Sequence, residues 1–353
     1  MYKVRLVKSQ EIGLKDNIEL FEDGYRTIEK SGNYEWWYLD SKYPDGSSLV
    51  IMFFTKPITS LSKKNRPYVT LDYKNPNGTE VHEVLKSDDY HFSKEKCDVR
   101  IGECYIRGDL NHYDIYFKNS GVECKLTLDG NVPSWRPEGG QIYFGKKDYF
   151  AWLPSIPEGK VEGNLISDGK QIDLLGTGYH DHNWGNKLMV FLMNDWYWGR
   201  AKIGDYVVVS SYIYANKKGK YTPTPVFMLS KDGKILTGDA SKYLTYEEKD
   251  FYKDTYINRY VAKTLIYDYN DEENDIHYRI TYTKKDDVEK HNSKEIMGNL
   301  LATIMKLVSF RPSYFRMSGT AKLEKIVNNE VVEVIESPAM WEQMAFRNDR
   351  IKY

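Results

Sequence analysis

The feature that most constrains the fold of this chain is a series of short runs of strand-forming residues separated by turn dipeptides. The runs are rich in Val, Ile, Thr, Tyr and Phe, the residue types that favour β-strands. Asp-Gly and Asn-Gly pairs favour tight hairpin turns, because these residue types accept a positive φ. Helical periodicity is missing between the runs, so the sequence predicts an all-β, mostly antiparallel fold and not a parallel sheet. The runs span residues 48–55, 67–74, 112–118, 122–129, 206–214, 264–270 and 277–283, and the pairs stand at 45–46, 77–78, 129–130, 168–169 and 232–233.

One segment, residues 294–309, departs from this pattern. Its apolar residues recur at the three- and four-residue spacing of a helix, which predicts one short amphipathic helix. Packing on the outside or end of a barrel is one interpretation. A lid, or an element that touches a membrane surface at the mouth of a pocket, is the other. The apolar residues are Ile296, Met297, Leu300, Leu301, Ile304, Met305 and Val308.

Length and composition limit the number of domains and the class of binding partner. A chain of 353 residues is long enough for about two domains, and we expect the boundary near residue 190, giving domains 1–190 and 191–353. The 50 Lys and Arg nearly balance the 51 Asp and Glu, so no net field favours binding to nucleic acid. The aromatic content of 14% suits an apolar pocket with a few hydrogen-bonding groups. We therefore expect a hydrophobic small molecule as partner.

The cysteine count and the hydropathy indicate the compartment. Cys97, Cys104 and Cys124 are too few, and odd in number, for a secreted disulfide framework. The first residues lack the apolar region of a signal peptide, and no run reaches the ~20 apolar residues of a transmembrane helix. We expect a cytoplasmic protein with reduced thiols and no transmembrane segment.

The densest group of reactive side chains is GTGYHDHNWG, residues 176–185. Each residue from Tyr179 to Asn183 carries a proton donor or acceptor, Trp184 follows, and the flanking glycines let the backbone turn sharply. Three interpretations are open: a metal site on His180 and His182, a structural polar network between the domains, and a catalytic or ligand-orienting site. No further set of metal ligands is evident, so we predict no bound metal and no cofactor.

Two other motifs place aromatic rings beside acids. In EWWYLD, strand alternation puts Glu35 and Trp37 on one face and Trp36 on the other. The two tryptophans suit a core, but an unpaired buried carboxylate is costly, which points to a role for Glu35 beyond packing. In DWYWGR, Trp196 and Trp198 share one strand face, as the wall of an apolar cavity or as a packing layer.

A fourth aromatic–acid pair, Trp341 and Glu342, stands near the C-terminus.

The chain resembles the carotenoid 1,2-hydratase family, also called hydroxyneurosporene synthase. The resemblance rests on five motifs in this order: EWWYLD, DGSSLVIMFFT, GTGYHDHNWG, DWYWGR and, more weakly, WEQM. AttH-like lipocalin-like proteins are relatives, and lipocalin-like Diels–Alderases are more distant ones. The resemblance runs from about residue 30 to the C-terminus. It implies two tandem lipocalin-like antiparallel β-barrels, with a hydrophobic ligand pocket between or within them.

The resemblance implies several reactions, because its members share a fold and an apolar pocket but not one chemistry. The hydratases add water to an alkene, and the Diels–Alderases fold a polyene that then cyclises. Adding water to an alkene requires a strong proton donor, and an Asp in an apolar pocket can be one. We expect Asp181 to be this acid, with His180 and His182 able to reprotonate it. Glu35 and Glu342 compete for the role.

The remaining site residues would bind substrate or stabilise charge. Aromatic faces stabilise a carbocation, a role we expect for Trp184, Trp196 and Trp198. Tyr179 and Asn183 could hydrogen-bond a carbonyl. We expect these residues, together with Trp37, Trp341 and Glu342, to belong to the substrate site, and the GYHDHNW and WYWGR motifs to line one pocket near the domain junction. A pericyclase that only folds the substrate and a non-catalytic carrier are the alternatives.

Overall fold

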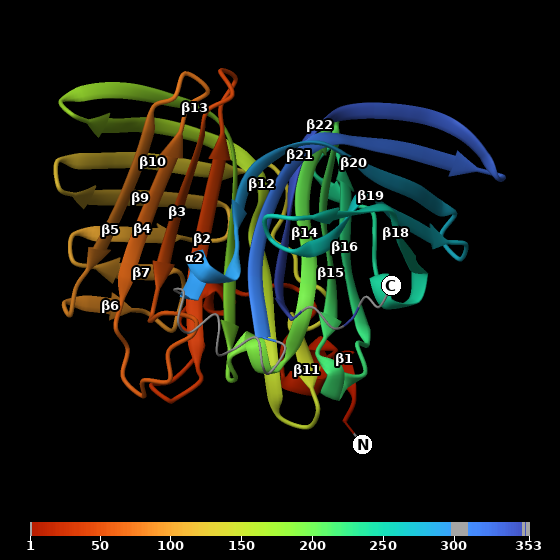
Figure 1. The fold of residues 1–353 in the computed structure, drawn as a ribbon, viewed down its shortest axis with the longest axis horizontal. Coiled ribbons are helices and arrows are strands. Elements are labelled where there is room, and N and C mark those ends of the chain that lie inside the picture. Colours follow the sequence, from red (N-terminus) through yellow and green to blue (C-terminus); the bar gives the residue numbers. More distant parts are fainter. Residues whose placement is uncertain (1, 298–309, 348–349, 351–353) are drawn as a thin grey trace. The chain divides into compact units, whose positions relative to one another are not determined.

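Antiparallel strands make up nearly all of the regular structure in the computed structural model, which describes residues 2–297, 310–347 and 350 (Figure 1). The strands form two sheets, of thirteen and nine strands, and every neighbouring pair along both strand orders is antiparallel. The predicted all-β, antiparallel fold is confirmed. Among the described residues, no helix is long and apolar enough to span a membrane.

The chain divides into two compact units. The N-terminal unit comprises Leu6–Tyr143 and Lys147–Met189, and the C-terminal unit comprises Met1–Arg5, Phe144–Lys146 and Val190–Tyr353.

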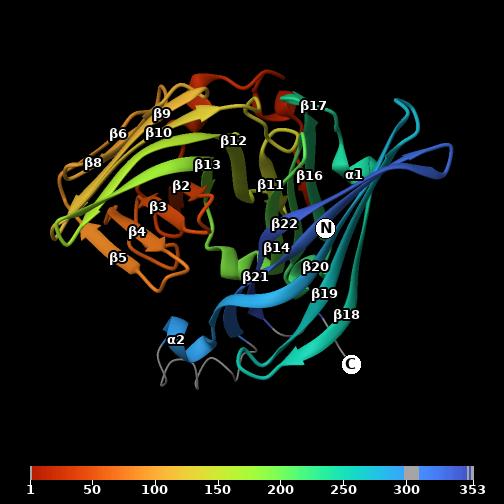
Figure 2. The same cartoon turned by 90° about the horizontal axis from the view of Figure 1, so that it is seen from above.

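The first sheet has the order β5-β4-β3-β2-β13-β12-β10-β9-β8-β7-β6, with β11 attached to β12 and β1 to β11. Its strands curl around an interior (Figure 2), and the Nδ2 of Asn119 on β9 donates to the Oε2 of Glu83 on β5 at 2.7 Å. The strands are β1 (Val4–Leu6), β2 (Tyr34–Lys42), β3 (Ser48–Phe54), β4 (Tyr68–Lys74), β5 (Glu80–Lys86), β6 (Tyr90–Phe92), β7 (Asp98–Ile101), β8 (Cys104–Gly108), β9 (His112–Asn119), β10 (Val122–Gly130), β11 (Gln141–Phe144), β12 (Asp148–Ser167) and β13 (Lys170–Gly185). The short 3₁₀ helices η1 (Ser9–Ile12) and η2 (Leu20–Asp23) precede β2.

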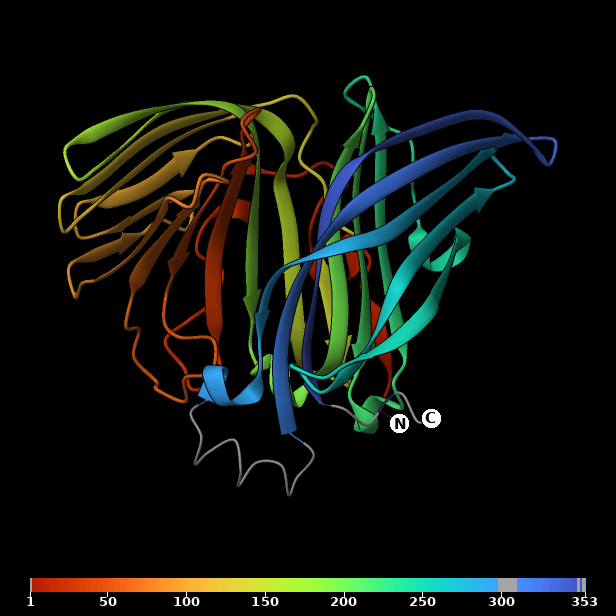
Figure 3. The same cartoon turned by 45° about the horizontal axis from the view of Figure 1, so that its top comes forward.

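The second sheet has the order β17-β16-β15-β14-β22-β21-β20-β19-β18. Its longest hairpin joins β21 and β22, whose blue strands are prominent in Figure 3. The strands are β14 (Met193–Ile203), β15 (Tyr206–Ala215), β16 (Pro223–Lys231), β17 (Lys234–Ile235), β18 (Leu244–Asp254), β19 (Arg259–Asp271), β20 (Ile276–His291), β21 (Phe310–Val327) and β22 (Glu330–Arg347). The described short helices are η3 (Met189–Phe191), η4 (Lys217–Gly219), α1 (Ala240–Tyr243) and α2 (Ser293–Met297).

The local predictions hold at most positions. All seven runs lie in strands, and four of the five turn pairs lie between consecutive strands with their glycines at positive φ. The pair at 129–130 is an exception, because Gly130 ends β10 and pairs with Gly159 of β12. Of the helix expected at 294–309, the structure describes only the part within α2; residues 298–309 lie outside the described residues.

The glycines of GTGYHDHNWG have a different role from the one expected. The segment is the second half of β13 and not a turn. A Cβ at Gly176 would lie 2.2 Å from the carbonyl oxygen of Lys42, and one at Gly178 would lie 2.4 Å from Cγ2 of Val161. These glycines therefore permit close packing between neighbouring strands and do not serve to reverse the chain.

Each sheet has its own hydrophobic core. The core of the N-terminal unit includes Trp37, Leu39 and Ile51. The core of the C-terminal unit includes Tyr197, Phe315 and Trp341. The side of each sheet that contributes to these clusters is called its core face below.

Candidate active site

The strands β2 and β13 are neighbours and carry most of the predicted site residues of the N-terminal unit. Their register pairs His182 with Trp37 and Asp181 with Tyr38. Because side chains alternate along a strand, these pairs lie on opposite faces of the sheet. The core face carries Glu35, Trp37, His180, His182 and Trp184, and the opposite face carries Tyr38, Asp40, Tyr179, Asp181 and Asn183.

Glu35 is fully buried on the core face, and its carboxylate is fully hydrogen-bonded. Its Oε1 accepts from Nε2 of His182 at 2.8 Å and from the backbone N–H of Arg26 at 2.7 Å. Its Oε2 accepts from the backbone N–H and the hydroxyl of Thr27 at 2.8 and 2.7 Å. The desolvation cost that singled out Glu35 is therefore offset by four hydrogen bonds within the protein.

The two histidines lie between acceptors on both sides. The Nδ1 of His182 lies 3.1 Å from the carbonyl oxygen of Glu22, while its ring stacks on Trp37 with centroids 4.7 Å apart. The Nδ1 of His180 lies 2.8 Å from the carbonyl oxygen of Tyr38, and its Nε2 lies 3.2 Å from Oδ2 of Asp23. A ring with acceptors at both nitrogens is the pattern of an imidazolium. On this pattern we assign the His180 ring, which lies beside the Asp23 carboxylate, the doubly protonated form.

Asp23, at the end of η2, is the residue of this cluster that sequence reasoning missed. Burial raises the pKa of its carboxyl, but the charge and hydrogen bond of His180, with His182 and the Tyr113 hydroxyl, more than offset this and leave the pKa below its usual value. Burial likewise lowers the pKa of His180, and Asp23 more than restores it, so this pKa lies above the usual one. The core face therefore holds a charge-paired network.

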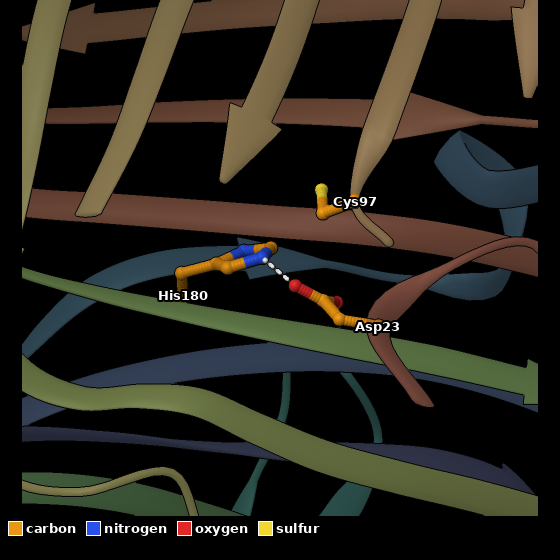
Figure 4. A group of neighbouring side chains, drawn as sticks. All are labelled: Asp23, Cys97 and His180. Carbon is orange, nitrogen blue, oxygen red and sulfur yellow. Dashed lines mark hydrogen bonds and ion pairs between the residues drawn. The ribbon is translucent and has the colours of Figure 1, made fainter. Parts of the chain in front are cut away.

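Within the described part of the chain, Asp23, Cys97 and His180 form a group that could hold a metal ion, since one ligand atom from each lies within 4.8 Å of the others (Figure 4). A metal needs a thiolate and a free ring nitrogen. Burial, more than any other cause, raises the pKa of the Cys97 thiol well above its usual value, and both nitrogens of His180 face acceptors. The donor set therefore suits hydrogen bonding better than a metal, and the absence of a metal stays a prediction.

Asp181 lies on the opposite face in a separate hydrogen-bonded group. Its Oδ2 accepts from the Tyr179 hydroxyl at 2.7 Å and from Nε1 of Trp152 at 2.8 Å, and its Oδ1 accepts from Nδ2 of Asn183 at 2.5 Å. The residue is only 5% exposed, and burial raises the pKa of its carboxyl to about 6 although these donors lower it. The carboxyl can therefore carry a proton near neutral pH.

This geometry corrects the expected partnership between Asp181 and its flanking histidines. His180 and His182 point to the core face and bond Asp23 and Glu35 there. Adjacent residues of an extended strand project in opposite directions, so neither ring reaches the Asp181 carboxyl. Reprotonation of Asp181 by these histidines is therefore not supported.

Two further residues belong to the Asp181 face. Trp152 reaches it from β12, where it pairs with Asn183, and no local sequence pattern indicates this contact. Asp40 is 7% exposed and accepts from the Tyr38 hydroxyl at 3.1 Å. Strand alternation along EWWYLD puts Asp40 and Tyr38 on this face, but it does not connect them to Asp181.

The predicted site residues of the C-terminal unit lie on both faces of its sheet. Trp196 and Trp198 are half-buried on one face of β14, as the alternation predicted. Trp341 belongs to the core, whereas Glu342 lies on the opposite face and accepts from the Tyr314 hydroxyl at 2.6 Å. A single pocket shared by these residues and the Asp181 group stays a prediction.

Comparison with known proteins is consistent with the sequence resemblance. Hydroxyneurosporene dehydrogenase of Chlorobaculum tepidum is 27% identical over 222 residues, which cover 51% of this chain and 56% of that protein. A Diels-Alderase of Gibberella fujikuroi is 32% identical over 155 residues, covering 43% of this chain and 39% of that protein. The matches thus span about half or less of these relatives.

The fold has a solved counterpart in CghA with Sch210972, with a TM-score of 0.64 over 99% of this chain and 100% of that one, at 14% identity. The Diels-Alderase-like family model matches residues 24–291, which contain both faces of the β2–β13 site. The chain therefore belongs to the Diels-Alderase-like family.

Proposed function

We propose that this protein is an enzyme that acts on an alkene or polyene of a hydrophobic small molecule, by acid-catalysed hydration or cyclisation. The observation that carries the proposal is Asp181, a nearly buried carboxyl whose pKa is raised to about 6. A protonated acid in an apolar setting is the group that alkene protonation requires. The names of the relatives, a Diels-Alderase among them, support a polyene substrate.

The reaction would begin with transfer of the Asp181 proton to one alkene carbon, which leaves a carbocation at the other. The carboxylate that remains is stabilised by donors from Tyr179, Trp152 and Asn183. In hydration, water attacks the cation and its surplus proton returns to Asp181. In cyclisation, a second double bond attacks the cation, and Asp181 takes the proton that the ring then loses.

The aromatic rings around Asp181 would protect the cation. Trp152 and Tyr179 contact the carboxyl directly, and the ring of Tyr38 lies 6.2 Å from that of Tyr179. An aromatic face within about 6 Å of a desolvated cation stabilises it by ~2 kcal/mol. The Glu35–His182 and Asp23–His180 pairs would position β2 and β13 and take no part in proton transfer.

A pericyclic reaction is the second candidate, and the family match favours it. In that reaction the protein folds a polyene into its reactive conformation, and a hydrogen bond from protonated Asp181 or from Tyr179 polarises a substrate carbonyl. No proton is transferred to carbon. A carrier without catalysis is the remaining alternative.

Deuterium incorporation separates these reactions. The full-length protein is incubated in D₂O with neurosporene, an acyclic polyene with terminal alkenes, and with a linear triene that carries an activated alkene. Acid catalysis places one solvent deuterium on a product carbon, whereas a pericyclic reaction places none. Asp181→Asn should lower an acid-catalysed rate by about 10²–10⁴-fold. Asp40→Asn, the same charge change on the same face, is the matched control.

The outcomes are distinct. Deuterated product that is lost in Asp181→Asn supports the proposal. Undeuterated cyclic product that survives in Asp181→Asn supports the pericyclase. Saturable binding of the polyene without turnover supports the carrier.

Location and membrane contact also stay proposals. The three cysteines are free and buried, which suits a reducing compartment such as the cytoplasm. Contact with a membrane surface through 294–309 rests on the sequence pattern alone.

A further inference from the structure

The guanidinium of Arg350 occupies a buried position in the C-terminal unit, although this residue follows β22 and belongs to no strand. Its Nε and Nη2 donate to the two carboxylate oxygens of Asp195 at 2.9 and 2.8 Å. Its Nη1 and Nη2 donate to the two carboxylate oxygens of Glu248 at 3.1 and 3.3 Å. The side chains of Asp195 and Glu248 are only 2% and 6% exposed. One cation therefore bonds two buried carboxylates, each through two hydrogen bonds.

An aromatic face completes the surroundings of this guanidinium. Its Cζ lies 3.6 Å from the centroid of the Tyr214 ring, and the Tyr214 hydroxyl donates to Oε1 of Glu248 at 3.0 Å. A flat cation over a ring, with carboxylate acceptors at its N–H groups, favours a guanidinium over the compact ammonium of lysine. Two buried carboxylates side by side also repel each other unless a cation bonds them. The position therefore requires a cation and fits a guanidinium.

The residues around the guanidinium face the core of the second sheet. Each of them stands two positions along its strand from a tyrosine that belongs to this core or packs against it. Side chains two positions apart on a strand point to the same side. The pairs are Asp195 and Tyr197 on β14, Tyr214 and Tyr212 on β15, and Glu248 and Tyr246 on β18.

The strands that Arg350 connects are not neighbours in the sheet. The strand order places β22, β21, β20 and β19 between β14 and β18, and β18 is an end strand. By contrast, Arg279 bonds Asp268 on the adjacent strand, which backbone pairing already holds. Among the described strands, β18 pairs through its backbone with β19 alone, and side chains connect it to β15, as in the stacked rings of Tyr212 and Tyr246. Arg350 therefore joins strands that the backbone leaves unpaired.

We propose that Asp195, Glu248 and Tyr214 form a guanidinium-binding site, and that Arg350 fills this site as a latch that holds β18 against β14 and β15. An end strand lacks one row of backbone hydrogen bonds, so β18 is the part of the sheet that the latch controls. When the Arg350 side chain is removed, the site keeps its carboxylates and its ring and takes an alkylguanidinium from solution. This inference is independent of Asp181 and of the proposed reaction.

The experiment uses Arg350→Ala in the full-length protein, a change that removes the atoms of an ethylguanidinium ion. Amide hydrogen exchange is measured by mass spectrometry with and without ethylguanidinium, and calorimetry measures its binding. Ethylurea has nearly the same shape without the charge, so it tests the need for a cation. Arg107→Ala is the matched control, because Arg107 bonds Asp98 at 2.9 Å and lies over the Tyr105 ring at an exposed position.

We expect exchange in β18 to rise at least about tenfold in Arg350→Ala, while exchange in β13 stays unchanged. Ethylguanidinium should bind this variant saturably and restore slow exchange, whereas ethylurea should do neither. The parent protein, whose site is filled, and Arg107→Ala should not bind ethylguanidinium. Absence of binding, or an equal effect of ethylurea, would overturn the guanidinium site. Unchanged exchange in β18, or a uniform rise across the C-terminal unit, would overturn the latch.

A second variant keeps the test decisive if Arg350→Ala does not fold. Asp195→Asn, Glu248→Gln and Arg350→Ala in one chain remove the latch and leave no unpaired buried charge. This triple variant should exchange quickly in β18 and bind no ethylguanidinium. Exchange in β18 as slow as in the parent protein would show that the latch does not hold this strand. Binding of ethylguanidinium to the triple variant would refute the role of the two carboxylates.

Discussion

The Asp181 carboxyl should make the protein lose stability as the pH rises, and Asp181→Asn should remove this loss. Burial raises the pKa of the carboxyl from 3.8 to about 6 in the folded protein. Between these values the folded state binds more protons than the unfolded state. The free energy of unfolding therefore falls as the pH increases through this window and is lowest, for this group, above about pH 6.

The size of this stability change follows from the pKa shift of Asp181. Each pKa unit is worth about 1.4 kcal/mol, so a shift of about two units corresponds to ~3 kcal/mol over the whole window. About half of this, ~1.4 kcal/mol, is lost between pH 5 and pH 8. The donors Tyr179, Trp152 and Asn183 fit an amide less well than a carboxylate, which adds a cost to Asp181→Asn. That cost does not vary with pH in this range.

Urea unfolding of the parent protein and Asp181→Asn at pH 5, 6, 7 and 8 measures the difference directly, since other titrating groups cancel. The stability of the parent relative to the variant should fall by ~1–2 kcal/mol from pH 5 to pH 8. Asp173→Asn, an exposed position of the same strand, supplies the control. A difference that stays constant within ~0.3 kcal/mol across the range would refute a protonated, desolvated Asp181.

Two further predictions concern buried charge. Arg350→Met leaves the Asp195 and Glu248 carboxylates buried without their guanidinium, so it should lower the free energy of unfolding in urea by about 3–5 kcal/mol. A loss under ~1 kcal/mol would show that these carboxylates are solvated. Glu35→Gln replaces an acceptor of four hydrogen bonds, one from His182, and should lower the free energy of unfolding by about 3 kcal/mol. An unchanged unfolding midpoint in a calorimetric scan would contradict the role assigned to these hydrogen bonds.

Local sequence determined the strands, most of the turns and the division of each motif between two faces. The preference of Asp-Gly and Asn-Gly for positive φ and the two-residue period of a strand act within a few residues, so both are visible without the fold. This two-residue period puts Glu35 and Trp37 on one face of the sheet and Tyr38 on the other. The same rule, applied to residues 176–185, places Asp181 on one face of the strand and His180 and His182 on the other. The flanking glycines were instead interpreted as turn residues.

Only the tertiary structure decided which groups meet. Asp23 bonds His180 across 157 residues of sequence, and Trp152 bonds Asp181 across 29. Neither contact has a local signature, because each depends on which strands become neighbours when the sheet curls. The acidity of Asp181 is likewise a tertiary property: it comes from removal of water by residues distant in sequence, and the residue type alone fixes only the value from which the shift starts.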